Sequence, residues 1–97
     1  MTLPVVFTVA ARADTLDAID WYEARQGGMG KSFAGELDDI TTRIGTNPLL
    51  FPVVRRGVRR AVLRRFPYGV FFRVLPDRVQ VIACLHTSRD PRRWEAR

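Results

Sequence analysis

The chain has 97 residues, with 46% hydrophobic and 27% charged side chains and a net charge of +6, a composition that excludes a disordered chain and indicates one domain over residues 1–97. Its apolar runs are too short to span a bilayer and its N-terminus lacks the features of a secretory signal, so we expect a cytoplasmic protein with no membrane partner. The single cysteine, Cys84, and the single histidine, His86, are too few for an internal disulfide or a structural zinc site, and we expect no metal and no cofactor.

The first half of the chain predicts a strand followed by a helical hairpin. Residues 5–9 alternate as in a short strand, and a helix follows from Asp14, which is placed to cap its N-terminus. The glycines within residues 27–30 break this helix. A second helix then runs to Asn47-Pro48, and its apolar residues recur at the spacing of one helical face: Met29, Phe33, Leu37, Ile40 and Ile44.

The second half predicts three strands, over residues 60–66, 68–75 and 78–86. Their connections are too short for a crossover, so the strands must be consecutive and antiparallel. Alternate residues of each strand are expected to share one face of the sheet. We therefore expect an α+β fold, in which an N-terminal strand and a helical hairpin pack on an antiparallel sheet in the order β-α-α-β-β-β.

The last residues predict a short C-terminal helix, with Asp90 as its N-cap and Pro91 at its first position. Trp94 is expected to fold back onto the core as a hydrophobic lid. Three arginines would then project from the other side of this helix: Arg92, Arg93 and Arg97.

Charge is divided unevenly along the chain. Residues 1–54 carry four basic and seven acidic side chains, a net −3, whereas residues 55–97 carry twelve arginines and three acids, a net +9. Scattered charge can simply form a solvated face. Because the planar guanidinium binds carboxylates and phosphates in pairs, the basic half favours a surface that engages an acidic protein or a nucleic acid.

Several catalytic and nucleotide-binding patterns are incomplete. Gly30-Lys31-Ser32 resembles the end of a phosphate-binding loop, but Arg25 stands where that motif needs a glycine, and a helix leads in instead of a strand. No nucleophile-elbow sequence surrounds Ser32 or Ser88, which argues against a serine hydrolase. RNA cleavage needs proton carriers as well as cations, and the basic half offers only a few: Tyr68, His86 and Glu95.

Five groups of residues, in this order, resemble the ParE branch of the ParE/RelE superfamily of bacterial type II toxin–antitoxin toxins. The match covers nearly the whole chain from about Ala11, and the order and spacing of the groups carry it more than any one of them. The groups are Trp21-Tyr22-Glu23, Gly28-Met29-Gly30 with Phe33, Asn47-Pro48 with Pro52, Arg64-Arg65-Phe66-Pro67-Tyr68, and His86 through Arg89-Asp90-Pro91 to Trp94.

The resemblance implies a growth-arresting toxin held inactive by a cognate antitoxin, with operator DNA reached only through that antitoxin. ParE-type members are reported to poison DNA gyrase, whereas RelE-type members cut messenger RNA on the ribosome. At positions where RelE-type nucleases carry an arginine, another basic residue and a tyrosine, this chain has Gly69, Val62 and Glu95. Only Arg60 and Arg89 match the nuclease pattern, which favours a binding inhibitor over an enzyme.

Three hypotheses follow. In the first, a non-enzymatic inhibitor of DNA gyrase binds its target through the basic half, at Arg60, Arg64, Arg65, Arg89, Arg92, Arg93 and Trp94. In the second, a ribosome-dependent endoribonuclease uses Arg60, Arg89 and His86 as its catalytic residues. In the third, which follows from charge alone, the chain is a basic nucleic-acid-binding module whose affinity falls steeply with salt.

Overall fold

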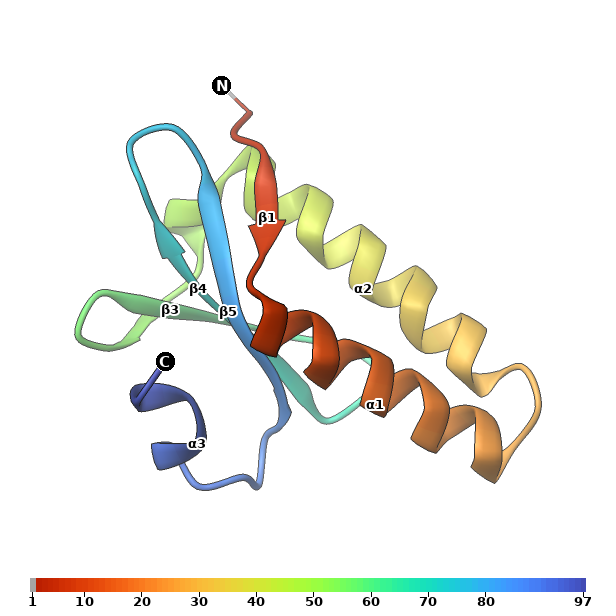
Figure 1. Cartoon of the computed structure of the whole chain (residues 1–97). Helices are drawn as coiled ribbons and strands as arrows, with labels where there is room; N and C mark the ends of the chain where they lie inside the picture. Colours follow the sequence, from red (N-terminus) through yellow and green to blue (C-terminus); the bar gives the residue numbers. More distant parts are fainter. Residues whose placement is uncertain (1) are drawn as a thin grey trace.

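The computed structural model describes residues 2–97, which form a five-stranded sheet with two long helices on one face (Figure 1). A short third helix packs on the opposite face. This arrangement confirms the predicted α+β fold. The elements in chain order are β1 (Val5–Phe7), α1 (Val9–Arg25), α2 (Met29–Thr46), the 3-10 turn η1 (Pro48–Leu50), β2 (Val53–Arg55), β3 (Val58–Val62), β4 (Tyr68–Val74), β5 (Val79–His86) and α3 (Arg92–Glu95).

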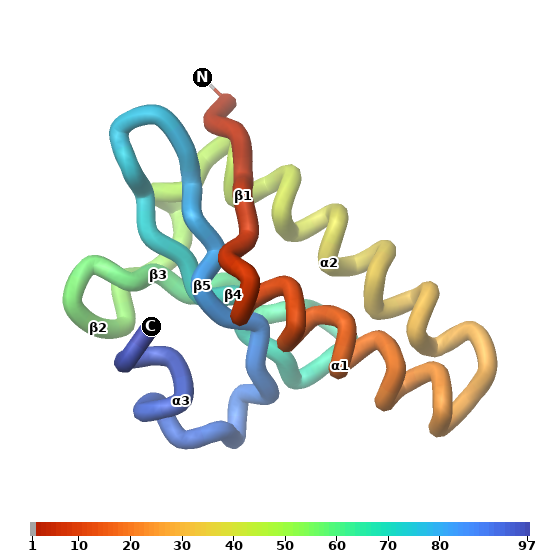
Figure 2. Tube along the Cα trace, viewed as in Figure 1, coloured from red at the N-terminus to blue at the C-terminus, as the bar shows by residue number. Residues whose placement is uncertain are grey.

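The strands lie in the order β1-β5-β4-β3-β2. β3, β4 and β5 are consecutive and antiparallel, as predicted. β1 joins the sheet as an edge strand parallel to β5, so it extends the sheet instead of packing on its face. The β2–β3 hairpin and α3 meet at the side of the molecule away from the helical hairpin (Figure 2).

α1 begins five residues earlier than predicted. The Thr8 side chain caps it by accepting a hydrogen bond from the Ala11 N–H at 3.1 Å, a usual N-cap contact. The prediction that Asp14 caps this helix was wrong, because Asp14 lies inside α1. Its carboxylate instead accepts the backbone N–H of Cys84 on β5, at 3.1 Å.

α2 buries the face that its periodicity predicts and ends at Thr46, with Asn47 as its C-cap. The two helices approach closely at Gly30, where an added Cβ would lie 2.8 Å from the Ile19 carbonyl oxygen. The Glu23 carboxylate accepts the N–H groups of Gly28 and Gly30, at 3.0 and 2.9 Å, at the start of α2. A carboxylate on free helix N–H groups also complements the helix dipole.

β2 is not among the predicted strands. It pairs with β3 across a tight turn in which Arg56 and Gly57 both have positive φ angles, 47° and 78°. Such a turn suits the twist of a two-residue hairpin. The strand predicted over residues 60–66 is β3, which starts two residues earlier and ends at Val62.

The pairing of β4 with β5 skips one residue, Ile82, because Phe71 pairs with Ala83 and Phe72 pairs with Val81. The side chains of β5 change faces at this bulge. Val81 packs toward α1 and α2, whereas Ala83 belongs to the cluster around α3. The prediction that every second side chain of this strand shares one face was therefore wrong beyond Val81.

The sheet thus separates two apolar clusters. The larger one fills the space between the sheet and the helical hairpin. The smaller one lies between the sheet and α3, and consists of Val58, Phe71, Ile82, Ala83, Leu85 and Trp94. Within the described part of the chain, no helix is long and apolar enough to cross a membrane.

Candidate functional site

α3 is seated on the sheet by Trp94. The indole is 6% exposed and stacks on the Phe71 ring, with centroids 4.8 Å apart and an interplanar angle of 24°. The prediction that this residue folds onto the core as a lid is confirmed. Because Trp94 is buried, it supports the basic surface and has little area of its own for a partner.

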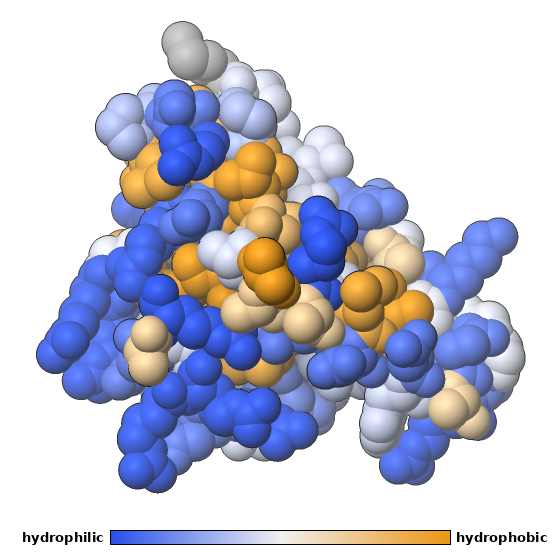
Figure 3. Space-filling model, viewed as in Figure 1, coloured by the Kyte–Doolittle hydropathy of each residue, from blue (hydrophilic) through white to orange (hydrophobic). Residues whose placement is uncertain are grey.

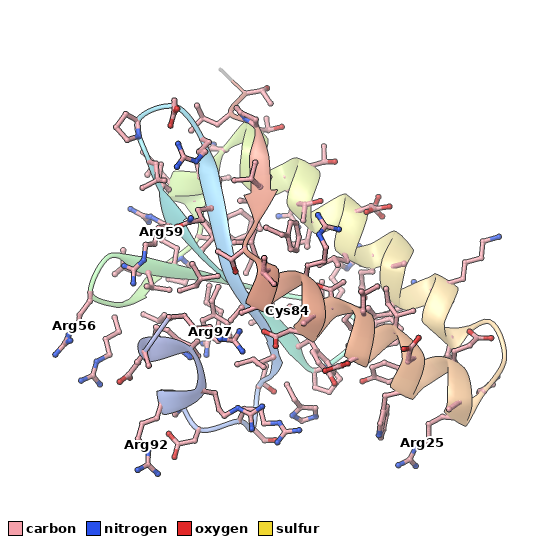
Figure 4. The ribbon with its side chains drawn as sticks, viewed as in Figure 1. Arg25, Arg56, Arg59, Cys84, Arg92 and Arg97 are labelled. Atoms are coloured by element: carbon pink, nitrogen blue, oxygen red, sulfur yellow. The ribbon has the colours of Figure 1, made fainter. Side chains whose placement is uncertain are left out.

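Arg97 also holds the C-terminal segment in place. Its guanidinium donates to the Asp14 carboxylate at 3.2 Å and to the Ile82 carbonyl oxygen at 3.1 Å. The prediction that Arg97 projects outward was wrong, because this side chain turns back toward α1 and the bulge of β5 (Figure 4).

Arg92 and Asp90 form a local pair at the start of α3. The Asp90 carboxylate accepts the Arg92 backbone N–H at 2.9 Å and its Nε–H at 3.0 Å, while Pro91 takes the N-cap position predicted for Asp90. The Arg92 guanidinium, which donates to this carboxylate, lowers the pKa of Asp90. Arg92 still points into solvent, so its positive charge remains available to a partner (Figure 4).

Four of the predicted site residues meet at one cavity of about 210 Å³ between α3 and the open face of the sheet: Arg60, His86, Arg89 and Trp94. Arg60 reaches it from β3, where its side chain crosses Gly69; a Cβ added at Gly69 would lie 3.2 Å from the Arg60 Cδ. The Arg60 Nε atom is buried and has no hydrogen-bond partner.

Arg64 and Arg65 lie elsewhere, in the β3–β4 loop beside α2. Their backbone N–H groups donate to the Glu36 carboxylate at 3.1 and 3.0 Å, and both residues line a separate cavity of about 480 Å³. The structure therefore divides the predicted target-binding residues into two groups, one around α3 and one beside α2.

A larger cleft, of about 640 Å³, lies on the other side of His86, between α1 and the loop that leads to α3. Arg89 and Arg93 line it together with acidic and aromatic side chains of α1. The His86 Nδ1 faces the Ser88 N–H at 3.1 Å and the Ser88 hydroxyl at 2.8 Å. Because the backbone N–H can only donate, Nδ1 is the acceptor and the ring proton of neutral His86 is on Nε2.

The other groups that could carry a proton are poorly placed for acid–base chemistry. Burial raises the pKa of the Tyr68 phenol, and it raises the pKa of the Cys84 thiol to about 12. Glu95 is held in an ion pair, with its Oε1 3.2 Å from Arg55 NH1. Among residues 2–97, no group of three or more His, Cys, Asp or Glu side chains could hold a metal ion.

Three arginines that are not among the predicted site residues extend the basic surface over the β2–β3 hairpin: Arg55, Arg56 and Arg73. Arg73 NH1 donates to the Arg56 carbonyl oxygen at 3.2 Å, which ties this hairpin to β4. Hydrophilic side chains gather over the hairpin and α3 in Figure 3, and Arg56 points away from the hairpin in Figure 4. The Arg56-Gly57 turn signal in the sequence marks the hairpin that presents them.

A second surface, over β1 and α1, is apolar. Val9 is 90% exposed, and Leu16 and Trp21 are each about half exposed. A cavity of about 330 Å³ between α1, α2 and β1 is lined by Leu16 among others. β1 pairs on one side only, so the backbone groups of its outer edge are open to another strand.

Comparison with known proteins places these features in context. A family model described as the ParE toxin of a type II toxin–antitoxin system, parDE, matches residues 5–91. A solved structure titled as a chromosomal ParDE toxin–antitoxin system from P. aeruginosa superimposes with a TM-score of 0.66 at 22% identity, over 88% of this chain and 96% of that one.

A second solved structure, the RelBE2 toxin–antitoxin complex from Mycobacterium tuberculosis, superimposes with a TM-score of 0.64 at 20% identity, over 89% of this chain and 99% of that one. At these identities the two structures show a shared fold. No curated protein sequence matches the chain.

Proposed function

The chain belongs to the ParE toxin family of type II toxin–antitoxin systems, and from this premise we propose that it arrests growth by binding DNA gyrase, without catalysis, until a cognate antitoxin neutralises it. The observation that carries the proposal is the concentration of arginines around α3 and the β2–β3 hairpin. Within residues 2–97, six of them form no ion pair with a carboxylate: Arg56, Arg59, Arg60, Arg73, Arg89 and Arg93.

The position of these charges suits a macromolecular target. Acidic side chains of the chain lie mostly on α1 and α2, on the far side of the sheet. The exposed guanidiniums around α3 would attract an acidic surface and orient the encounter, because complementary charge raises the association rate and fixes the register of docking.

The state of the proton carriers supports binding without catalysis. A general base must have a free acceptor near the proton that it removes. The Nδ1 of His86 is already engaged by Ser88, Glu95 is paired with Arg55, and burial raises the pKa of the Tyr68 phenol, which makes it a weaker acid.

The antitoxin in this proposal uses both surfaces of the chain. An apolar segment fits the exposed residues of α1 and the cavity beside β1, where an extended chain can also add a strand to the open edge. Acidic residues of the same partner would cover part of the arginine surface. Covering that surface would block access of the target.

Expression of the chain alone tests the proposal. Growth should stop, and thymidine incorporation should fall before leucine incorporation does, because inhibition of gyrase blocks replication first. Co-expression of the antitoxin should restore both rates. A fall of leucine incorporation first would contradict gyrase as the target.

One observation favours a second candidate, a ribosome-dependent endoribonuclease: Arg60, Arg89 and His86 line the same cavity. Primer extension on ribosome-bound messages tests it. New cleavage sites that vanish in the His86→Ala and Arg89→Ala variants would support the nuclease. Intact messages during full growth arrest would reject it.

A further inference from the structure

The cavity beneath α3 is lined by an arginine with an unsatisfied donor. The Arg60 Nε–H is buried without a hydrogen-bond partner, and the Arg60 side chain lines a space of about 210 Å³, compared with the roughly 10–15 Å³ that one water molecule needs. A buried donor that has lost water and gained no acceptor is unfavourable. The cavity therefore has room for an acceptor from outside the chain, beside an arginine whose hydrogen bonding is incomplete.

The same cavity contains an imperfectly bound carboxylate. Glu95 Oε1 lies 3.2 Å from Arg55 NH1 but accepts no hydrogen bond there, so the pair is a contact of charges alone. The Glu95 side chain is 25% exposed, which leaves it a path to solvent. One carboxylate with a weak contact partly neutralises a site whose charge is otherwise positive.

The balance of charge in the cavity favours an anion. Arg55, Arg60 and Arg89 line it, and Glu95 is its one acidic side chain among the described residues. Thr87 also lines this cavity. Three guanidiniums and one carboxylate leave two positive charges in excess, which repel each other until an anion enters.

The walls of the cavity strengthen this preference. The apolar side chains of Phe71, Leu85 and Trp94 form part of its lining, to which His86 also belongs, and they keep part of it away from bulk water. Hydrogen bonds from guanidinium to an oxyanion are stronger in such surroundings and frequently bidentate. A spherical halide would satisfy fewer of these donors than an anion with several oxygens.

We propose that this cavity is a binding site for a small oxyanion, a phosphate or a carboxylate group, and that Glu95 occupies it as an internal substitute that lowers its affinity. The external anion binds the guanidinium groups that line the cavity, that of Arg60 among them, and the Glu95 side chain moves toward solvent. The site shares Arg60 and Arg89 with the surface of the proposed function, but a titration with small anions needs no target and can therefore fail or succeed separately.

Nuclear magnetic resonance of the arginine Nε–H groups tests the site in the full chain. Sodium phosphate, sodium acetate and sodium chloride are titrated at constant ionic strength. The Arg60 Nε–H resonance should shift saturably with phosphate or acetate and not with chloride. Saturation by phosphate alone identifies a phosphate site, and saturation by acetate identifies a site that also accepts carboxylates.

Two variants separate this site from general screening of charge. Glu95→Gln keeps the shape of the side chain and should tighten binding about fivefold, because a competing charge contact is lost. Asp77→Asn removes a carboxylate from the exposed pair with Arg78 and should leave the affinity unchanged.

The inference is overturned if Arg60 shows no saturable shift in the wild-type chain, or if the two variants change the affinity equally. Should Glu95→Gln fail to fold, the wild-type titration alone decides. In that titration, if the exposed Arg78 and Arg92 resonances shift as much as that of Arg60, the shifts report general screening of charge, and the proposed site is rejected.

Discussion

Asp14 and Arg97, 83 positions apart in the sequence, are joined by hydrogen bonds from both guanidinium NH groups to the carboxylate. The same carboxylate accepts the Cys84 N–H, and the same guanidinium donates to the Ile82 carbonyl oxygen. The pair therefore connects α1, the bulge of β5 and the C-terminal segment. It fixes the position from which α3 presents its arginines.

Loss of this connection should destabilise the protein. We expect Arg97→Ala to lower the free energy of unfolding by about 1.5–3 kcal/mol, the range for hydrogen bonds to charged groups, because a mostly buried carboxylate loses its partner. Urea denaturation measures the change. Arg92→Ala, which removes an exposed arginine from the same segment, should leave stability nearly unchanged, and an equal loss in both variants would contradict the role of Arg97.

Trp94 should be the main anchor of α3. Trp94→Ala removes a buried ring from the smaller apolar cluster and should lower the free energy of unfolding by about 3–5 kcal/mol. Trp21→Ala, at a half-exposed position on α1, should cost less than about 1 kcal/mol. Chemical denaturation of both variants checks this order, and comparable losses would mean that α3 is not held by the stack on Phe71.

Two glycines of α2 should respond to alanine in opposite directions. Gly30→Ala places a methyl group 2.8 Å from the Ile19 carbonyl oxygen and should destabilise the hairpin by about 1–3 kcal/mol. Gly35→Ala meets no atom within 4 Å and should stabilise the protein by about 0.5–1 kcal/mol, because alanine favours a helix. Thermal unfolding of the pair measures both signs.

The Cys84 thiol should be inert in the folded protein. Burial raises its pKa from 9.0 to about 12, so the folded state holds the proton more tightly than the unfolded state. The resulting stability is complete below about pH 9 and is lost as pH rises toward 12. An aromatic disulfide reagent at about pH 8 should react slowly with the native chain and rapidly in denaturant. Fast reaction in native buffer would contradict this burial.

The sequence predicts the helical hairpin and the three antiparallel strands well because their periodicities are long enough to be distinctive. α2 repeats its apolar face over 18 residues and buries that face. β2 has only three residues, and its pairing with β3 is irregular. A strand this short shows no alternating pattern in the sequence, so it is recognised only by its pairing with β3.

The site could be predicted only in part. The excess of arginine in the second half is visible in the sequence, and so is the terminal helix that carries several of them. Arg97 turns inward because its guanidinium binds the Asp14 carboxylate. Arg64 and Arg65 lie away from the arginines around α3, in a loop whose backbone N–H groups bind Glu36. These contacts join residues far apart in the chain, so spacing alone does not reveal them.

DNA supercoiling by purified gyrase is the most direct test of the central claim. The wild-type chain should inhibit supercoiling, and the double variant Arg89→Ala/Arg93→Ala, which removes two cations beside α3, should need at least about tenfold more protein. The matched control Arg25→Ala/Arg78→Ala removes two cations elsewhere and should inhibit as the wild type does. Full supercoiling at saturating wild-type chain, or equal weakening of the two double variants, would contradict the account.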